Sequence, residues 1–197
     1  MSRRRAVFFD RDGTLMDEVE YCSDPAKVRV IPGTPEALGE LKRAGFLTVI
    51  ISNQSGIGRG WFTEAEFQAV QEELQRQLAQ GSLGAGGGPL IDAAYFCADP
   101  PGVPSLRRKP APGMILEAAA DLQIDLASSF MVGDKALDVE SGRRAGTRTI
   151  LVRTGYGADV ERNPDFEPAD FVADDVADAV RWILGLQAPA ARANPPA

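Results

Sequence analysis

The chain has 197 residues, and none of them is histidine. This absence excludes an imidazole general base, a serine–histidine–aspartate relay and any metal site built on histidine ligands. Catalysis by this chain must therefore rest on carboxylates, lysine, hydroxyl groups or thiols.

Cysteine is nearly absent as well, with Cys22 and Cys97 far apart in the chain. Two thiols cannot complete a four-ligand zinc site, and they form neither a C-x-x-C motif nor a dense disulfide framework. We expect free, partly buried thiols in a reducing cytoplasm.

Long apolar runs are missing too. The basic N-terminus, Met1–Arg5, is followed only by Ala6–Phe9 before the acidic Asp10, which is too short for a signal-peptide core. No run approaches the length of a membrane span. We therefore expect a cytoplasmic protein without a membrane partner.

Positive charge is in deficit, with 21 Lys and Arg against 28 Asp and Glu and a net charge of -7. This balance argues against a general electrostatic affinity for nucleic acid. An anionic ligand must therefore be held by a local group of positive charges.

The length and the 44% hydrophobic content predict one domain over residues 1–186, followed by an Ala/Pro-rich flexible tail over 187–197. We expect a monomer.

Short apolar runs alternate with longer helical patterns, as in a parallel sheet with crossover helices. Strands are predicted at 6–9, 46–51, 93–97, 129–132, 149–152 and 171–172, and helices at about 35–44, 63–80, 113–122, 137–145 and 176–186. A capping box of Thr63 and Glu66 begins the second helix, and residues 81–89 are predicted to form a flexible loop. The alternation predicts a single Rossmann-like, three-layer α/β/α domain with a mainly parallel sheet.

Polar residues follow three of the predicted strands. Asp10 and Asp12 come after the first strand, 52–55 after the second and 133–135 after the fourth, while Lys109 lies in the loop after the third. Ligands of such sheets bind outside the carboxyl ends of the strands. The sequence therefore predicts one site that collects these side chains.

The residue types at this edge indicate phosphoryl chemistry. Asp10, Asp12 and Asp134 offer the oxygen ligands that a hard divalent cation requires, and magnesium fits better than zinc. Magnesium usually combines one or two protein carboxylates with a substrate phosphate. A lysine and a serine hydroxyl can neutralise the oxygens of a transferring phosphoryl group, and an aspartate can act as its nucleophile.

These residues also carry a resemblance to a known family. Asp10–Thr14 (D-R-D-G-T), Ser52, Lys109–Pro110 and the G-D-K-x-x-D stretch of 133–138 resemble the four ordered motifs of the haloacid dehalogenase superfamily of phosphohydrolases. The stretches 53–60, 108–114 and 130–135 are similar to its branch of heptose bisphosphate phosphatases and histidinol-phosphatases. No large insertion follows the first or second motif, which in this superfamily implies a capless member with an open cleft.

The resemblance implies a role for each matched residue. Asp10 is the expected nucleophile, and Asp12 is the expected general acid and base. Ser52 and Lys109 are expected to hold the phosphoryl oxygens, while Asp10, Asp134 and the main-chain carbonyl of Asp12 coordinate Mg²⁺. The residues expected to contact the substrate are Tyr21, Asn53, Gln54, Ser55, Arg108 and Lys135.

The resemblance also implies a small phosphorylated sugar as substrate, and the expected reaction removes the 7-phosphate of D-glycero-D-manno-heptose 1,7-bisphosphate. Histidinol phosphate or another small phosphometabolite is the alternative within the branch. A phospho-accepting signalling domain is an alternative of another class. Asp12 argues against it, because an acid/base next to the nucleophile promotes turnover.

One segment departs from the family pattern. Many members of the branch carry a Cys-x-His and Cys-x-Cys zinc loop before the Arg-Lys-Pro stretch, whereas only Cys97 remains here. Bound zinc is therefore not expected, and the departure affects the shape of the substrate entrance. Pro100, Pro101 and Pro104 are expected to stiffen the loop without a metal.

Several residues keep two interpretations. Asp138 either reaches the metal through water or orients Lys135, and Asp134 can also cap a helix. Arg11 is interpreted as structural. The Gly-x-Gly-x-Gly of 56–60 lacks the full dinucleotide-binding spacing and predicts a turn, and Trp61–Phe62 predicts a hydrophobic staple and core anchor.

Overall fold

The architecture is a six-stranded parallel sheet in the order β3-β2-β1-β4-β5-β6. It is seen in a computed structural model that describes residues 3–81 and 88–186. The strands are β1 (Ala6–Phe9), β2 (Leu47–Asn53), β3 (Ala93–Cys97), β4 (Phe130–Gly133), β5 (Arg148–Val152) and β6 (Phe171–Ala173). This arrangement confirms the predicted Rossmann-like α/β fold class.

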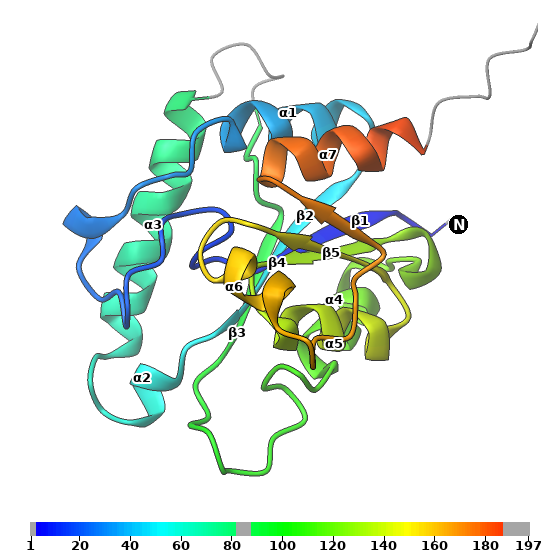
Figure 1. Ribbon diagram of the computed structural model, residues 1–197. Coiled ribbons are helices and arrows are strands. Elements are labelled where there is room, and N and C mark those ends of the chain that lie inside the picture. The colour runs from blue at the N-terminus through cyan, green and yellow to red at the C-terminus, as the bar shows by residue number, and fades with distance from the viewer. Residues whose placement is uncertain (1–2, 82–87, 187–197) are drawn as a thin grey trace, which may run out of the picture.

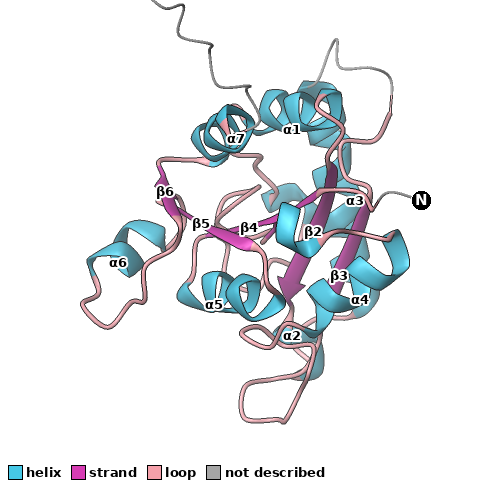
Figure 2. Ribbon diagram, turned by 90° about the vertical axis from the view of Figure 1, so that its right-hand side faces the viewer, coloured by secondary structure: helices cyan, strands magenta, loops and turns pink. Residues whose placement is uncertain are grey.

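Helices cover both faces of the sheet (Figures 1 and 2). They are α1 (Thr34–Arg43), α2 (Ser55–Gly58), α3 (Glu64–Gly81), α4 (Gly113–Leu122), α5 (Ala136–Ala145), α6 (Gly157–Arg162) and α7 (Val176–Gly185). Short 3₁₀ turns occupy Pro25–Lys27 and Leu126–Ser128. Figure 2 shows α1 and α7 on one side of the sheet and α4 and α5 on the other.

The four residues of β1 explain how the core divides. Val7 and Phe9 pack into the apolar cluster formed with α1, α3 and α7. Ala6 and Phe8 point the other way, into the cluster formed with α4. Because successive side chains of a strand alternate between faces, a fully apolar strand is the pattern that a two-sided core requires.

Most element boundaries agree with the sequence prediction within one or two residues. The capping box is confirmed, because the N–H of Thr63 donates to Glu66 Oε2 at 2.7 Å and the N–H of Glu66 donates to Thr63 Oγ1 at 3.2 Å. Strand β2 extends to Asn53. Ser52 and Asn53 therefore belong to the strand itself and do not follow it.

Two short helices were not predicted. Helix α2 occupies 55–58, where a turn was predicted, and α6 occupies 157–162. Both are too short for a recognisable apolar repeat. The segment after α2 also differs in part from the prediction. Phe62 is buried, but Trp61 is 55% exposed. The prediction of a core anchor is therefore right for Phe62 and wrong for Trp61.

The predicted tail, 187–197, and most of the predicted loop, 82–87, lie outside the described residues. The division of the chain at residue 186 stays a prediction. No helix within 3–81 and 88–186 is long and apolar enough to cross a membrane.

We expect buried side chains of the apolar cluster around α1, α3 and α7 to contribute much more to stability than exposed apolar side chains. Leu74→Ala removes a fully buried side chain of this cluster and should lower the free energy of unfolding by about 2–5 kcal/mol. Leu116→Ala on α4 is the matched control, because that side chain is 46% exposed, and it should change stability by less than about 1 kcal/mol. Chemical denaturation measures both. Equal effects of the two substitutions would contradict this view of the core.

Candidate active site

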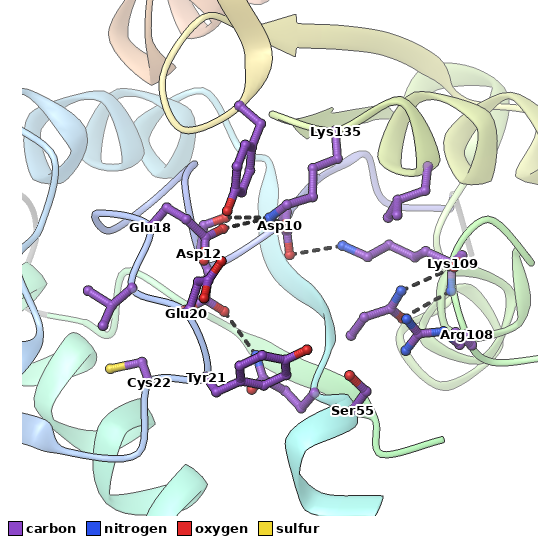
Figure 3. A pocket seen from close by; sticks show the side chains of 15 residues that line it. Asp10, Asp12, Glu18, Glu20, Tyr21, Cys22, Ser55, Arg108, Lys109 and Lys135 are labelled. Atoms are coloured by element: carbon purple, nitrogen blue, oxygen red, sulfur yellow. Dashed lines mark hydrogen bonds and ion pairs between the residues drawn. The ribbon is translucent and has the colours of Figure 1, made fainter. Parts of the chain in front are cut away.

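The site lies where the strand order changes direction. Strand β1 pairs with β2 on one side and with β4 on the other, and parallel sheets bind ligands beside the carboxyl ends of strands at such a point. A pocket of about 240 Å³ opens there. Asp10 and Asp12 from the end of β1, Lys109 from the loop after β3 and Lys135 from the end of β4 all line it (Figure 3).

Lys109 is the buried cation of the site. Its ammonium group lies 2.9 Å from Asp10 Oδ1 and 2.6 Å from Asp138 Oδ1, and it donates to the carbonyl of Ile51 at 2.8 Å. The three contacts use its three hydrogens. Burial alone would lower the pKa of Lys109, but the charges of Asp10 and Asp138 raise it above its ordinary value. The lysine is therefore cationic.

Asp10 is poised as an ionised carboxylate. Burial alone would raise its pKa, but the positive charges of Lys109 and Lys135 outweigh burial and hold the pKa of Asp10 below its usual value. The N–H of Asp10 donates to the carbonyl of Val132 in β4 at 2.9 Å, so its main chain is fixed. An ionised, buried carboxylate at the edge of a pocket is a competent nucleophile.

Asp134 is enclosed by backbone. Its Oδ2 accepts the N–H of Tyr156 at 2.9 Å. A Cβ at Gly13 would lie 2.3 Å from Asp134 Oδ2, and one at Gly155 would lie 2.2 Å from it, so any larger residue at either position would collide with the carboxylate. Gly13 also has a φ of +86°, which favours glycine. Asp134 is not a helix cap, because the N-cap of α5 is Lys135.

The acidic cluster fits a divalent cation. Carboxylate oxygens of Asp10, Asp134 and Asp138 lie within 4.8 Å of one another. Asp134 Oδ1 is buried and accepts no hydrogen bond from the described residues, and the nearest ammonium, that of Lys135, is 3.6 Å away. A buried oxygen of this kind is unfavourable without a partner. Oxygen ligands in this number and of this hardness suit magnesium.

Asp138 belongs to the same cluster but faces Lys109. Its Oδ1 forms the ion pair with that lysine, and its Oδ2 accepts the N–H of Lys135 at 3.0 Å. Burial raises the pKa of Asp138 to about 6, against the opposing charge of Lys109. Of the two interpretations left open by the sequence, the contacts favour an orienting role, which extends to Lys109.

The carboxylate of Asp12 is held by residues outside the acidic cluster. Arg11 holds it with two hydrogen bonds, from Nε to Oδ2 at 3.1 Å and from Nη2 to Oδ1 at 3.0 Å. Gln54 Nε2 donates to Asp12 Oδ2 at 2.9 Å and to Ser52 Oγ at 2.8 Å. The arrangement fixes the orientation of both Asp12 and Ser52, and only the main-chain carbonyl of Asp12 faces Lys135, at 3.4 Å.

Lys135 bridges the cluster and the loop that follows β1. Its ammonium forms an ion pair with Glu18 Oε2 at 2.7 Å and lies 3.9 Å from Asp10 Oδ2. It also lies 5.1 Å from the ring centroid of Tyr156, within cation–π range. Lys135 therefore brings a positive charge to the wall of the pocket.

The other residues predicted to contact substrate also line the pocket. Asn53 pairs with the main chain of Lys109, donating to its carbonyl at 3.1 Å and accepting its N–H at 3.0 Å. Arg108 Nη1 donates to the carbonyl of Asp99 at 2.9 Å. Tyr21 and Ser55 lie on the side of the pocket opposite Lys135 (Figure 3).

Hydrogen bonds hold together the segment that departs from the family pattern. Ser105 Oγ accepts the N–H groups of Arg107 and Arg108 at 3.2 and 3.1 Å and lies 3.7 Å from Cys97 Sγ. Hydrogen bonds from Ser105 and from Cys97 lower the pKa of Asp99. These contacts connect the end of β3 to the residue before Lys109.

Sequence reasoning did not identify Tyr156. The structural role predicted for Arg11 agrees with its contacts, because it is fully buried and holds the Asp12 carboxylate. Tyr156 was not considered, although it follows β5 and the strand-end rule that found the other residues applies to it as well. Nothing in the sequence pairs Arg11 with its neighbour, because adjacent charged residues are common on surfaces.

The comparisons with known proteins agree with this geometry. A HAD-hydrolase-like family model matches residues 106–179. A D-glycero-D-manno-heptose-1,7-bisphosphate 7-phosphatase of Thermosynechococcus vestitus is 40% identical over 199 residues, covering 94% of this chain and 98% of that protein. The corresponding phosphatase of Escherichia coli K12 is 38% identical over 193 residues and covers 94% and 96%.

The solved structures include a D,D-heptose 1,7-bisphosphate phosphatase from B. bronchiseptica in complex with magnesium and phosphate. It has a TM-score of 0.84 and 29% identity, and the match covers 92% of this chain and 99% of that one. The fold and the site thus define a phosphatase of the haloacid dehalogenase type. The chain belongs to the D-glycero-D-manno-heptose-1,7-bisphosphate 7-phosphatase family.

The acidic cluster predicts an unusual pH dependence for the metal-free protein. Burial, followed by the charges of Asp10 and Asp138, raises the pKa of Asp134 to about 7 from an ordinary value of 3.8, and the pKa of Asp138 is also raised. At a pH between the ordinary pKa and the raised pKa, each of these two carboxyl groups keeps its proton in the folded protein and has lost it in the unfolded chain. The stability contributed by these groups is therefore lost as pH rises through the folded pKa.

With a chelator present, the unfolding temperature should therefore be higher at about pH 5.5 than at about pH 7.5. No imidazole titrates in this window, because the chain lacks histidine. Magnesium should reduce the difference, and so should Asp134→Asn. Differential scanning fluorimetry makes the measurement, and an unfolding temperature that rises with pH in the chelated protein would refute the expectation.

Proposed function

We propose that this phosphatase is a magnesium-dependent phosphomonoesterase that releases the 7-phosphate of D-glycero-D-manno-heptose 1,7-bisphosphate through an aspartyl-phosphate intermediate. The observation that carries the proposal is the Asp10 carboxylate at the pocket, with Lys109 Nζ at 2.9 Å and Asp12 two residues further on. The relatives at 38% and 40% identity support the substrate.

The charge balance of the pocket supports the metal. Four carboxylates line it (Asp10, Asp12, Glu18 and Glu20) against three cations (Arg108, Lys109 and Lys135). Asp12 carries a proton when it acts as the acid, which leaves three charges of each sign, so an anionic phosphorylated substrate would meet no net positive charge there without a divalent cation. Asp10, Asp134 and the Asp12 carbonyl are the proposed ligands. When bound, magnesium supplies positive charge to the phosphoryl oxygens.

In the first step, an oxygen of Asp10 attacks phosphorus, and the bond between phosphorus and the sugar oxygen breaks. Asp12 gives its proton to the departing alkoxide, which leaves as the sugar hydroxyl. Ser52 can donate its hydroxyl hydrogen to a phosphoryl oxygen, because its Oγ only accepts from Gln54. Lys109 would exchange one of its three contacts for a second phosphoryl oxygen.

In the second step, Asp12 takes a proton from a water molecule, which attacks phosphorus and restores the Asp10 carboxylate. The same carboxyl group therefore serves as acid and then as base. Arg11 and Gln54 hold it on the pocket side of the β1 loop throughout, which keeps it beside the reacting oxygen. No histidine is needed for either proton transfer.

The rest of the pocket would recognise the sugar and its second phosphate. We assign this to Tyr21, Asn53, Gln54, Ser55, Arg108 and Lys135, which line the pocket around Asp10. Arg108 and Lys135 offer the charged donors that a second phosphate group needs. The pocket volume of about 240 Å³ supports a small substrate.

We further propose that the protein acts as a monomer in the cytoplasm and binds neither nucleic acid nor membranes. The net charge of -7 supports the lack of polyanion binding. Cys22 and Cys97 are buried free thiols, which fits a reducing compartment.

Asp10→Asn should abolish turnover while leaving the fold intact. The amide keeps the shape of the carboxylate but loses the nucleophile, so kcat should fall by at least about 10³-fold. Asp159→Asn on the exposed α6 is the matched control and should retain activity. Phosphate release is measured with magnesium and with chelator. Turnover that survives Asp10→Asn, or that ignores the chelator, would overturn the mechanism.

The substrate is tested by comparing kcat/KM for heptose 1,7-bisphosphate, heptose 7-phosphate and histidinol phosphate. We expect the bisphosphate to have the highest value, because the proposal assigns Arg108 and Lys135 to the recognition of the phosphate that is not hydrolysed. Phosphorus NMR should identify heptose 1-phosphate as the product. Release of the anomeric phosphate, or a preference for histidinol phosphate, would contradict the assignment.

A further inference from the structure

An aromatic pair lies at the rim of the pocket, outside the phosphoryl site. Tyr21 lines the pocket with a side chain that is 43% exposed, and its ring contacts Trp61 with a centroid separation of 4.2 Å and an interplanar angle of 83°. This edge-to-face geometry is a favourable arrangement of two aromatic rings. The pair joins the loop after β1 to the segment after α2, which are distant in sequence.

The backbone supports each partner of the pair. Tyr21 has a φ of +52°, an uncommon conformation for a residue other than glycine. The main-chain N–H of Trp61 donates to the carbonyl of Gly56 at 2.9 Å. The neighbouring Phe62 packs so closely on Gly56 that a Cβ there would lie 2.1 Å from its ring. Trp61 is therefore held by a buried neighbour, while its own ring remains outside the core.

Arg59 extends the arrangement. Its guanidinium lies 4.7 Å from the centroid of the Trp61 ring, within cation–π range. The tryptophan thus has Arg59 and Tyr21 as ring contacts. A tryptophan that is 55% exposed and contacts a pocket residue contributes little to the core.

We propose that Trp61 is a positioning residue that holds the Tyr21 ring at the rim of the pocket and so determines how tightly the substrate binds. The proposal rests on the proposed function, because it takes Tyr21 as a contact of the sugar phosphate. A free tyrosine side chain would lose rotamer freedom on binding, and fixing the ring beforehand removes part of that entropic cost. Trp61 itself does not line the pocket.

The position of the pair limits its effect to binding. Figure 3 shows the Tyr21 ring across the pocket from the Asp10 carboxylate and Lys135. The contacts of Asp10 and Asp12 involve neither aromatic ring. Loss of Trp61 should therefore raise KM and leave kcat close to the wild-type value.

The test is steady-state kinetics on the phosphomonoester with the highest kcat/KM in the substrate comparison. Trp61→Ala should raise KM about two- to tenfold, the range that corresponds to the loss of one aromatic pair. Trp61→Phe should restore most of the affinity. Trp182→Phe is the control, because Trp182 lies on α7 and stacks on Phe171 with centroids 4.8 Å apart, so its KM should not change.

A double-mutant cycle distinguishes positioning from a general structural effect. If Trp61 acts through Tyr21, then Trp61→Ala should have little effect on KM in a Tyr21→Ala background.

Tryptophan fluorescence tests the contact directly. In the Trp182→Phe protein, Trp61 is the remaining tryptophan, since the chain has two. Its emission should then change when Tyr21→Ala is introduced, and saturating substrate in an Asp10→Asn protein should reduce quenching by acrylamide.

The outcomes separate the two proposals. A wild-type protein without activity on any ester overturns the proposed function. If the wild-type protein is active, three results would overturn only the present inference. These are an unchanged KM in Trp61→Ala, a kcat that falls as much as kcat/KM in that variant, and additive effects of the Trp61 and Tyr21 substitutions. A raised KM, unchanged kcat, rescue by phenylalanine and a non-additive cycle support it.

Discussion

A lysine ammonium held between two buried carboxylates is the interaction on which the site depends. Lys109 is 2% exposed and contacts Asp10, Asp138 and the main chain of β2. An isolated buried charge is strongly unfavourable, so each of these groups needs the others. The same cluster keeps Asp10 ionised and places Asp134 beside the charges of Asp10 and Asp138, with no hydrogen-bond donor to its Oδ1 among the described residues. The ionised state of Asp10 and the fit of the acidic cluster to a divalent cation therefore have a common electrostatic origin.

The sheet makes this concentration of charge possible. Strands β1, β2 and β4 are apolar on both faces, and they end together at the point where the strand order reverses. Polar side chains that follow them must converge, because the strands are parallel and adjacent. Glycine at positions 13 and 155 then lets two loops close over Asp134. The fold thus buries Asp134 and Asp138 completely and leaves Asp10 and Asp12 facing a pocket.

How well the sequence predicts the site differs from one residue to the next. Asp10, Asp12, Asp134 and Lys109 could be predicted because each follows a strand in a recognisable motif, and the structure brings them to one edge. The orientation of the Asp12 carboxylate could not be predicted, because it depends on Gln54, which is 42 positions away. Trp61 was assigned to the core because aromatic residues before a helix often pack there. Its neighbour Phe62 fills that position, and Trp61 contacts Tyr21.

The sequence by itself determined the chemistry. A chain without histidine must rest its chemistry on carboxylates, lysine, hydroxyl groups or thiols, and the resemblance of its motifs to the haloacid dehalogenase superfamily implies that Asp10 and Asp12 are the nucleophile and the acid/base. Only the tertiary structure decided which charges meet. The ion pairs of Lys109, the two donors on Asp12, the Glu18–Lys135 pair and the aromatic pair at the rim each join or orient side chains through packing. Their partners are fixed by distance in space, which local sequence patterns do not encode.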